Sequence, residues 1–169
     1  ELVPDDARAV LHVRDLRQLS DDVDALVAQL VTLEPRPKEV LAQTLARLVH
    51  AGFTSDEELA DLGFRTDADF VLALAEVDPG TLTALIHVAD EDRVRAVLQS
   101  EMAGSTKEHD GILYHSSDAK AFVFVDDVLV FSFSDHGVPW VIDALHGRSG
   151  VLSESERFKK LADTAFGED

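Results

Sequence analysis

The chain has 169 residues with 33 acidic against 15 basic side chains, so its formal net charge is −18. A charge of this size repels phosphate backbones and anionic membrane surfaces, which argues against nucleic acid as a partner. Hydrophobic residues make up 46% of the chain, which separates it from disordered segments, and cysteine is absent. No run reaches the roughly 18 apolar residues of a membrane span. We therefore expect a soluble, folded chain without disulfides and without direct membrane insertion.

The first part of the chain predicts one strand followed by three helices. Residues 9–13, AVLHV, follow a turn-forming Pro-Asp-Asp stretch and predict a short strand. Apolar residues recur at helical spacing over 16–33 and again over 40–49. A capping box that begins at Ser55 then opens a short helix, which ends at Gly63.

The periodicity changes after this third helix. Apolar runs at 70–77 and 82–88, joined by Asp-Pro-Gly-Thr, predict a hairpin, since proline and glycine suit the two central positions of a type II turn. Asp90 begins another helix. Residues 107–111 are interpreted as a polar connection to a strand at 112–116.

The last part of the chain predicts a second hairpin and two helices. Residues 121–125 and 128–133 form the hairpin around two adjacent aspartates. Pro139 suits the first turn of a helix that runs to Leu145. A capping box at Ser153 opens the last helix.

The predicted order is therefore β-ααα-ββ-α-βββ-αα, and the predicted fold class is α+β. Strands joined by short hairpins indicate a mainly antiparallel sheet, for which we expect five to six strands with helices packed on it. No composition shift or long linker divides the chain. We therefore expect a single α+β domain over residues 5–166.

The hairpin FVFVDDVLVFSF at 122–133 is apolar on both faces. A two-residue turn at Asp126-Asp127 places the large side chains on one face and the small ones on the other. The large face carries Phe122, Phe124, Leu129, Phe131 and Phe133, and we expect the thick helical layer on it. The small face is led by Val123, Val125, Val128 and Val130. A valine row facing water is unexpected, so we predict that these four residues form an interaction face covered in part by another module or subunit.

No catalytic site, metal site or cofactor is predicted. The stretch HSSD at 115–118 holds the letters of a hydrolytic triad, but neighbours on a strand point to opposite faces and cannot relay a proton. The seven histidines include no pair at zinc-ligand spacing. The acidic groups around Asp21, Asp67 and Asp90 suggest a calcium site, because calcium binds clustered oxygen ligands. None of them fits the twelve-residue calcium loop, so we interpret them as solvated or capping groups.

Several stretches carry a resemblance in sequence order over nearly the whole chain. They are VPDDARAVLHVRDL, LADLGFRTDADFVLALAEVDPG, LIHVADEDRVRAVL, HDGILYHSSDAKAFVFVDDVLVFSFSD and VIDALHGRSGVLSESERFKKLA. Together they resemble a family of uncharacterised bacterial cell-envelope proteins, the domain of unknown function numbered thirty-three fifty-two. The resemblance implies an exported, anchored protein of the periplasm or cell envelope in which such modules can occur in tandem. It supplies no reaction and no catalytic residues.

Two classes of function remain open. The first is a non-catalytic extracytoplasmic interaction or structural module, whose partner is another copy of the module or an envelope protein. The second is a binding protein for a small apolar ligand held between sheet and helices. A large enclosed apolar cavity would favour the second class, and a flat exposed apolar patch would favour the first.

Overall fold

A computed structural model of the chain describes residues 2–13, 31–32, 56–75, 82–117, 120–148 and 150–151. Several predictions lie outside these residues: the helix over 40–49, the turn at 78–81 and the helix from Ser153. The helix predicted over 16–33 also lies outside them, apart from its last residues.

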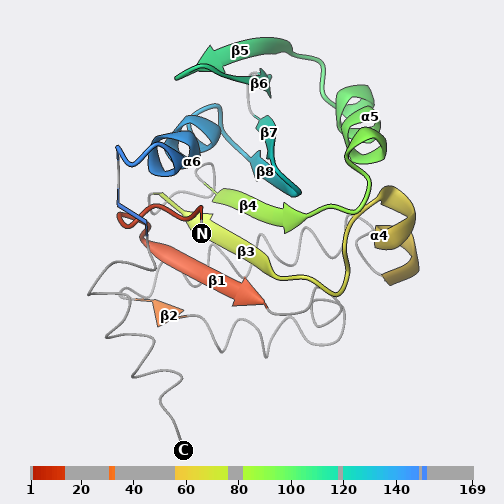
Figure 1. Cartoon of the computed structure of the whole chain (residues 1–169), viewed down its shortest axis with the longest axis horizontal. Helices are drawn as coiled ribbons and strands as arrows, with labels where there is room; N and C mark the ends of the chain where they lie inside the picture. The colour runs from red at the N-terminus through yellow and green to blue at the C-terminus, as the bar shows by residue number, and fades with distance from the viewer. Residues whose placement is uncertain are drawn as a thin grey trace, which may run out of the picture.

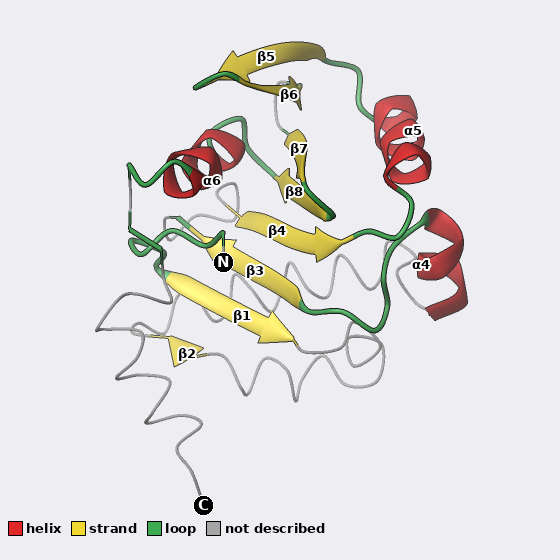
Figure 2. Cartoon of the chain, in the orientation of Figure 1, coloured by secondary structure: helices red, strands yellow, loops and turns green. Residues whose placement is uncertain are grey.

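The described residues form an antiparallel sheet with helices packed on it (Figure 1). Its strands are β1 (Ala9–Val13), β2 (Val31–Thr32), β3 (Phe70–Leu74), β4 (Leu82–His87), β5 (Ser105–His109), β6 (Ile112–Ser116), β7 (Ala121–Val125) and β8 (Val128–Ser132). Their order in the sheet is β2-β1-β3-β4-β8-β7-β6-β5. The helices of the described residues are α4 (Asp56–Leu62), α5 (Glu91–Glu101) and α6 (Gly137–Leu145) (Figure 2).

The α+β class is confirmed, but the sheet is larger than the predicted five to six strands. It has seven strands of five or six residues, together with the two-residue β2. The six predicted strands are all present. The two additional strands, β2 and β5, come from segments that the sequence pattern assigned to a helix and to a connection.

The first correction concerns β2, because Val31 and Thr32 belong to the segment predicted as helix. They pair with β1 in antiparallel register, Val31 opposite Val10 and Thr32 opposite Ala9. The helical spacing of apolar residues continues to Leu33, but β-branched residues also suit a strand. Pairing with a strand about twenty positions earlier in the chain decides between the two, and helical periodicity carries no information about that pairing.

The second correction concerns β5, because its residues 107–109 belong to the segment predicted as a polar connection over 107–111. Asp110 and Gly111 have φ of 50° and 81°, as in the tight turn that the dipeptide Asp-Gly favours in hairpins. This turn brings His109 opposite Ile112 and aligns β5 with β6 over five residue pairs. Strand prediction relies on an apolar face, and Ser105–Glu108 are all exposed, so the usual signal is missing.

Several local predictions are confirmed. The strand at 9–13 is β1 to the residue. The side chain of Asp90 caps α5 by accepting a hydrogen bond from the backbone N–H of Arg93 at 3.0 Å. Gly63 ends α4 with a φ of +99°, a conformation that side chains disfavour. The two-residue turn predicted at Asp126-Asp127 is also confirmed, with a register from Val125 opposite Val128 to Ala121 opposite Ser132.

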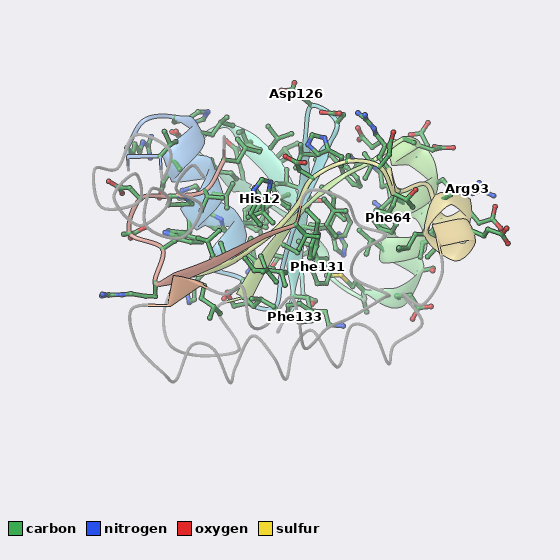
Figure 3. The ribbon with its side chains drawn as sticks, turned by 90° about the horizontal axis from the view of Figure 1, so that it is seen from below. His12, Phe64, Arg93, Asp126, Phe131 and Phe133 are labelled. Carbon is green, nitrogen blue, oxygen red and sulfur yellow. The ribbon has the colours of Figure 1, made fainter. Side chains whose placement is uncertain are left out.

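The phenylalanine face of this hairpin belongs to the largest apolar cluster of the described residues. Phe122 and Leu129 are fully buried there, together with Leu59 of α4 and Val94 of α5. The rings of Phe131 and Phe133, both labelled in Figure 3, meet edge to face with centroids 5.2 Å apart. Phe122 and Leu129 therefore lie in a core to which α4 and α5 contribute. The other large side chains of this face are partly buried and pack against that core: Phe124, Phe131 and Phe133.

Candidate functional site

The valine face, defined as Val123, Val125, Val128 and Val130, is covered in part by α6 of the same chain. Val123 and Val130 are only 5% and 0% exposed. They form one apolar cluster with three buried side chains of α6: Val138, Val141 and Ile142. The cover that the sequence analysis assigned in part to another module is thus provided here by a helix that follows β8 directly. Val123 and Val130 are core residues and cannot contact a partner.

Only the turn end of the valine face remains open. Val125 and Val128 are partly buried, and Val128 packs against the cluster of Val3, Ala73 and Leu85. For Val125 and Val128 the interaction-face hypothesis stays a prediction, while the rest of this surface is closed by α6 and the N-terminal segment.

The side chains of one ion-paired group lie at this open end, at the turn of the β7–β8 hairpin. Asp127 accepts a hydrogen bond from His87 at 3.1 Å and from Arg65 at 3.4 Å. The hydrogen bond from His87 lowers the pKa of the Asp127 carboxyl, and the charges of His87 and Arg65 act in the same direction. The contacts join the hairpin turn to the end of β4 and to the segment after α4. Figure 3 shows the neighbouring turn residue, Asp126, at the outer tip of the hairpin.

The β5–β6 hairpin joins the rest of the sheet through few residue pairs. The other pairs between strands of five or six residues have five residue pairs each. β6 pairs with β7 only through His115 opposite Phe122 and Ser116 opposite Ala121. Closer to the β5–β6 turn, β6 no longer pairs with β7, and apolar side-chain contacts take the place of backbone hydrogen bonds. Tyr114 is buried in the α6 cluster, and Ile112 packs against it.

The tip of this hairpin is tied to the end of α6 by a second group of charged side chains. His109 and Asp143 are 2.9 Å apart, Asp110 contacts both His146 and Arg148, and Arg148 also lies 3.6 Å from Asp143. The hydrogen bond from His146 lowers the pKa of the Asp110 carboxyl, and the charge of Arg148 lowers it further. The group therefore acts as an electrostatic clasp between hairpin tip and helix.

β5 is one of the two edge strands of the sheet, with the two-residue β2 at the other end, and no other described strand pairs with its outer side (Figure 1). In a hairpin closed by a two-residue turn, the pair that flanks the turn exchanges hydrogen bonds, and such pairs alternate with non-bonded ones. His109, Lys107 and Ser105 therefore direct their backbone groups towards β6. The backbone N–H and C=O groups of Thr106 and Glu108 point outwards, where no other described strand meets them.

The side chains of β5 alternate in the same way. Lys107 lies 3.8 Å from Asp135 and His109 contacts Asp143, so both face the α6 side. Thr106 and Glu108 face the opposite side and are exposed. Lysine is a residue type that commonly protects a free sheet edge from pairing, and the one lysine of β5 lies near Asp135 on the α6 side.

The HSSD stretch does not form a catalytic arrangement among the described residues. The ring of His115 donates to the carbonyl of Met102 at 3.1 Å and lies against Phe122. Ser116 is buried and donates to the neighbouring carbonyl of Ser117. Asp118 lies outside the described residues.

Within the described ranges, no group of three or more metal-ligating side chains comes together. Two of the carboxylates that suggested a calcium site contact nitrogen groups: Asp67 lies 3.9 Å from Arg65, and Asp69 lies 3.0 Å from His12. Asp90 caps α5, and Asp21 lies outside the described residues. In the part of the chain with described structure, no helix is long and apolar enough to cross a membrane.

Sequence reasoning missed the two features that distinguish this surface, the clasp and the free β5 edge. The clasp joins residues more than thirty positions apart in sequence, so no local residue spacing predicts it. The edge had one signal, the dipeptide Asp110-Gly111 before an apolar run, which favours a two-residue hairpin.

The fold places the chain in the class of α+β proteins with an open antiparallel sheet. Comparisons with family models, curated proteins and solved structures found no match for the chain. Its resemblance to the bacterial cell-envelope family therefore stays a proposal.

Proposed function

We propose that the protein is a non-catalytic interaction or structural module of the bacterial cell envelope, located outside the cytoplasm, and that the β5–β6 hairpin is its partner-binding element. The envelope location rests on the family resemblance of the sequence. The choice of element rests on the β5 edge, defined as Ser105–His109 with its outward backbone groups.

The observation that carries this proposal is that the β5 edge is exposed while side-chain contacts hold its hairpin on the rest of the fold. Its first four residues are exposed, while the hairpin is fixed by Tyr114 in the core and by the clasp on α6. A preorganised edge loses little conformational entropy when a partner pairs with it.

Site-specific photo-crosslinking in the native host tests the proposal. A photoreactive residue would replace Thr106 on the edge and, as a matched control, Glu57 on the exposed face of α4. We expect a discrete crosslinked protein from position 106 and none from position 57. A protease added to cells tests the location. A protein that resists the protease in intact cells and is degraded once the outer layers are opened lies outside the cytoplasm.

Two outcomes contradict the proposal. The first is the absence of any adduct at position 106, or equal adducts at both positions. The second is a lipid or other apolar molecule that co-purifies with the protein in native mass spectrometry in stoichiometric amount. That result would favour the alternative function, a binding protein for a small apolar ligand.

A further inference from the structure

We infer that the β5 edge binds an extended, positively charged segment of a partner protein by adding it as one more antiparallel strand. The inference rests on the proposed function, because it names the partner's chemistry and the binding mode for the same edge. Its basis is the direction of the backbone groups of β5 and the charge of the chain.

The backbone of β5 offers two residues for pairing. Thr106 and Glu108 each present an N–H and a C=O outwards, while their neighbours are paired with β6. An added strand satisfies these groups by main-chain hydrogen bonds, which provide affinity without requiring a particular sequence. Proline, which would prevent this pairing, is absent from β5.

The side chains select the charge of the added strand. Lys107 is engaged by Asp135, so the charge that β5 presents on its other face is that of Glu108. A cationic side chain directly opposite Glu108 gives a favourable cross-strand pair. The exposed Leu113 is the inner neighbour of Glu108 and offers apolar surface beside this pair. The net charge of −18 adds long-range attraction for a basic segment.

A second copy of this chain suits the edge poorly. When a two-fold axis relates two antiparallel strands, side chains directly opposite one another lie on the same face of the sheet. If all five residues of β5 pair with a second β5, the pairing is centred on Lys107. That register places Glu108 opposite Thr106 of the other copy, so Glu108 gains no cationic partner. Both copies also carry the same large negative charge. We therefore assign the edge to a different, basic partner.

A short capped peptide with alternating lysine and valine provides the probe, and the same peptide with glutamate in place of lysine is its control. We expect the lysine peptide to shift the backbone amide signals of Thr106 and Glu108 saturably in NMR titrations of the whole chain. We expect no such shift with the glutamate peptide. Because part of the attraction is electrostatic, added salt should weaken the binding.

Variants of the edge separate strand addition from general charge attraction. Thr106→Pro removes an outward N–H but none that faces β6, so it should weaken lysine-peptide binding by about tenfold or more. Thr106→Val keeps the N–H and should bind as the unmodified chain does. Glu108→Lys keeps the whole backbone and should lose the lysine peptide and gain the glutamate peptide, which provides a test even if Thr106→Pro alters the hairpin.

Equal binding of the lysine peptide to Thr106→Pro and Thr106→Val would overturn the inference, as would signal shifts spread over the whole acidic surface, or no binding. A discrete crosslink at position 106 without peptide binding would leave the proposed function standing and remove this inference. Peptide binding without a crosslink in the host would remove the proposed function, while strand addition at β5 as a binding mode would stand. Association of the chain with itself through β5 would show that the second copy was wrongly excluded.

Discussion

The substitution Val130→Lys tests whether the valine face is core or binding surface. Val130 is fully buried between β8 and α6, against Val138 and Ile142, which are also fully buried. Loss of the buried valine costs about 1.5 to 3 kcal/mol. Burial of an unpaired ammonium group adds several kcal/mol. Their sum is on the order of 5 kcal/mol or more, which is comparable to the whole stability of a typical domain at roughly 5 to 15 kcal/mol. We expect this variant to be largely unfolded or to unfold at much lower urea concentration.

Val125→Lys is the matched control on the same valine row. Val125 is partly exposed, and its neighbours in the turn are Asp126 and Asp127, so an added ammonium group can remain in water near negative charge. We expect a loss of at most about 1 kcal/mol.

Urea unfolding followed by the fluorescence of Trp140 measures both variants. Trp140 reports on α6, since its indole N–H donates to Asp6 at 2.8 Å and its ring packs on the clusters below the helix. A cooperative transition of Val130→Lys near the unmodified midpoint would refute the reasoning. It would mean that α6 does not close this face in solution, and that the valine row is available to another module after all.

Three further predictions follow from charge and packing. The lowered pKa of Asp110 means that its clasp contributes stability above the ordinary aspartate pKa and that this contribution is lost as pH falls through the folded pKa. The difference in urea midpoint between the unmodified chain and Asp110→Asn should therefore be largest near neutral pH and shrink below about pH 4; a constant difference would contradict this. Gly137→Ala places a methyl group onto the hydroxyl of Ser132 beneath the start of α6, so we expect a loss of about 1 to 3 kcal/mol in urea unfolding, and an unchanged midpoint would show that the helix can shift freely. Moderate sodium chloride should raise the melting temperature, because screening relieves the repulsion of 33 acidic against 15 basic residues; an unchanged or lower value would indicate that local pairs already compensate the charge.

Local features of the sequence determined several elements by themselves. Alternation of large and small apolar residues and a two-residue turn at Asp126-Asp127 determined the β7–β8 hairpin with its register. Asp90 determined the start of α5, because a short acidic side chain can accept from the first free N–H groups of a helix. These interactions join residues close in sequence, so their spacing alone specifies them.

The tertiary structure decided what lies on each surface. Val31 and Thr32 became a strand because β1 lies beside them, and Ser105–His109 became one because the Asp110-Gly111 turn folds them onto β6. The sequence showed that a valine row needs a cover, but only the path of the chain after β8 makes α6 that cover. The clasp arises in the same way, from contacts between segments far apart in sequence, and such contacts leave no periodic pattern in the residues that take part. The β5 strand pairs with the neighbouring β6, but its exposed polar side chains lack the apolar alternation that marks a strand.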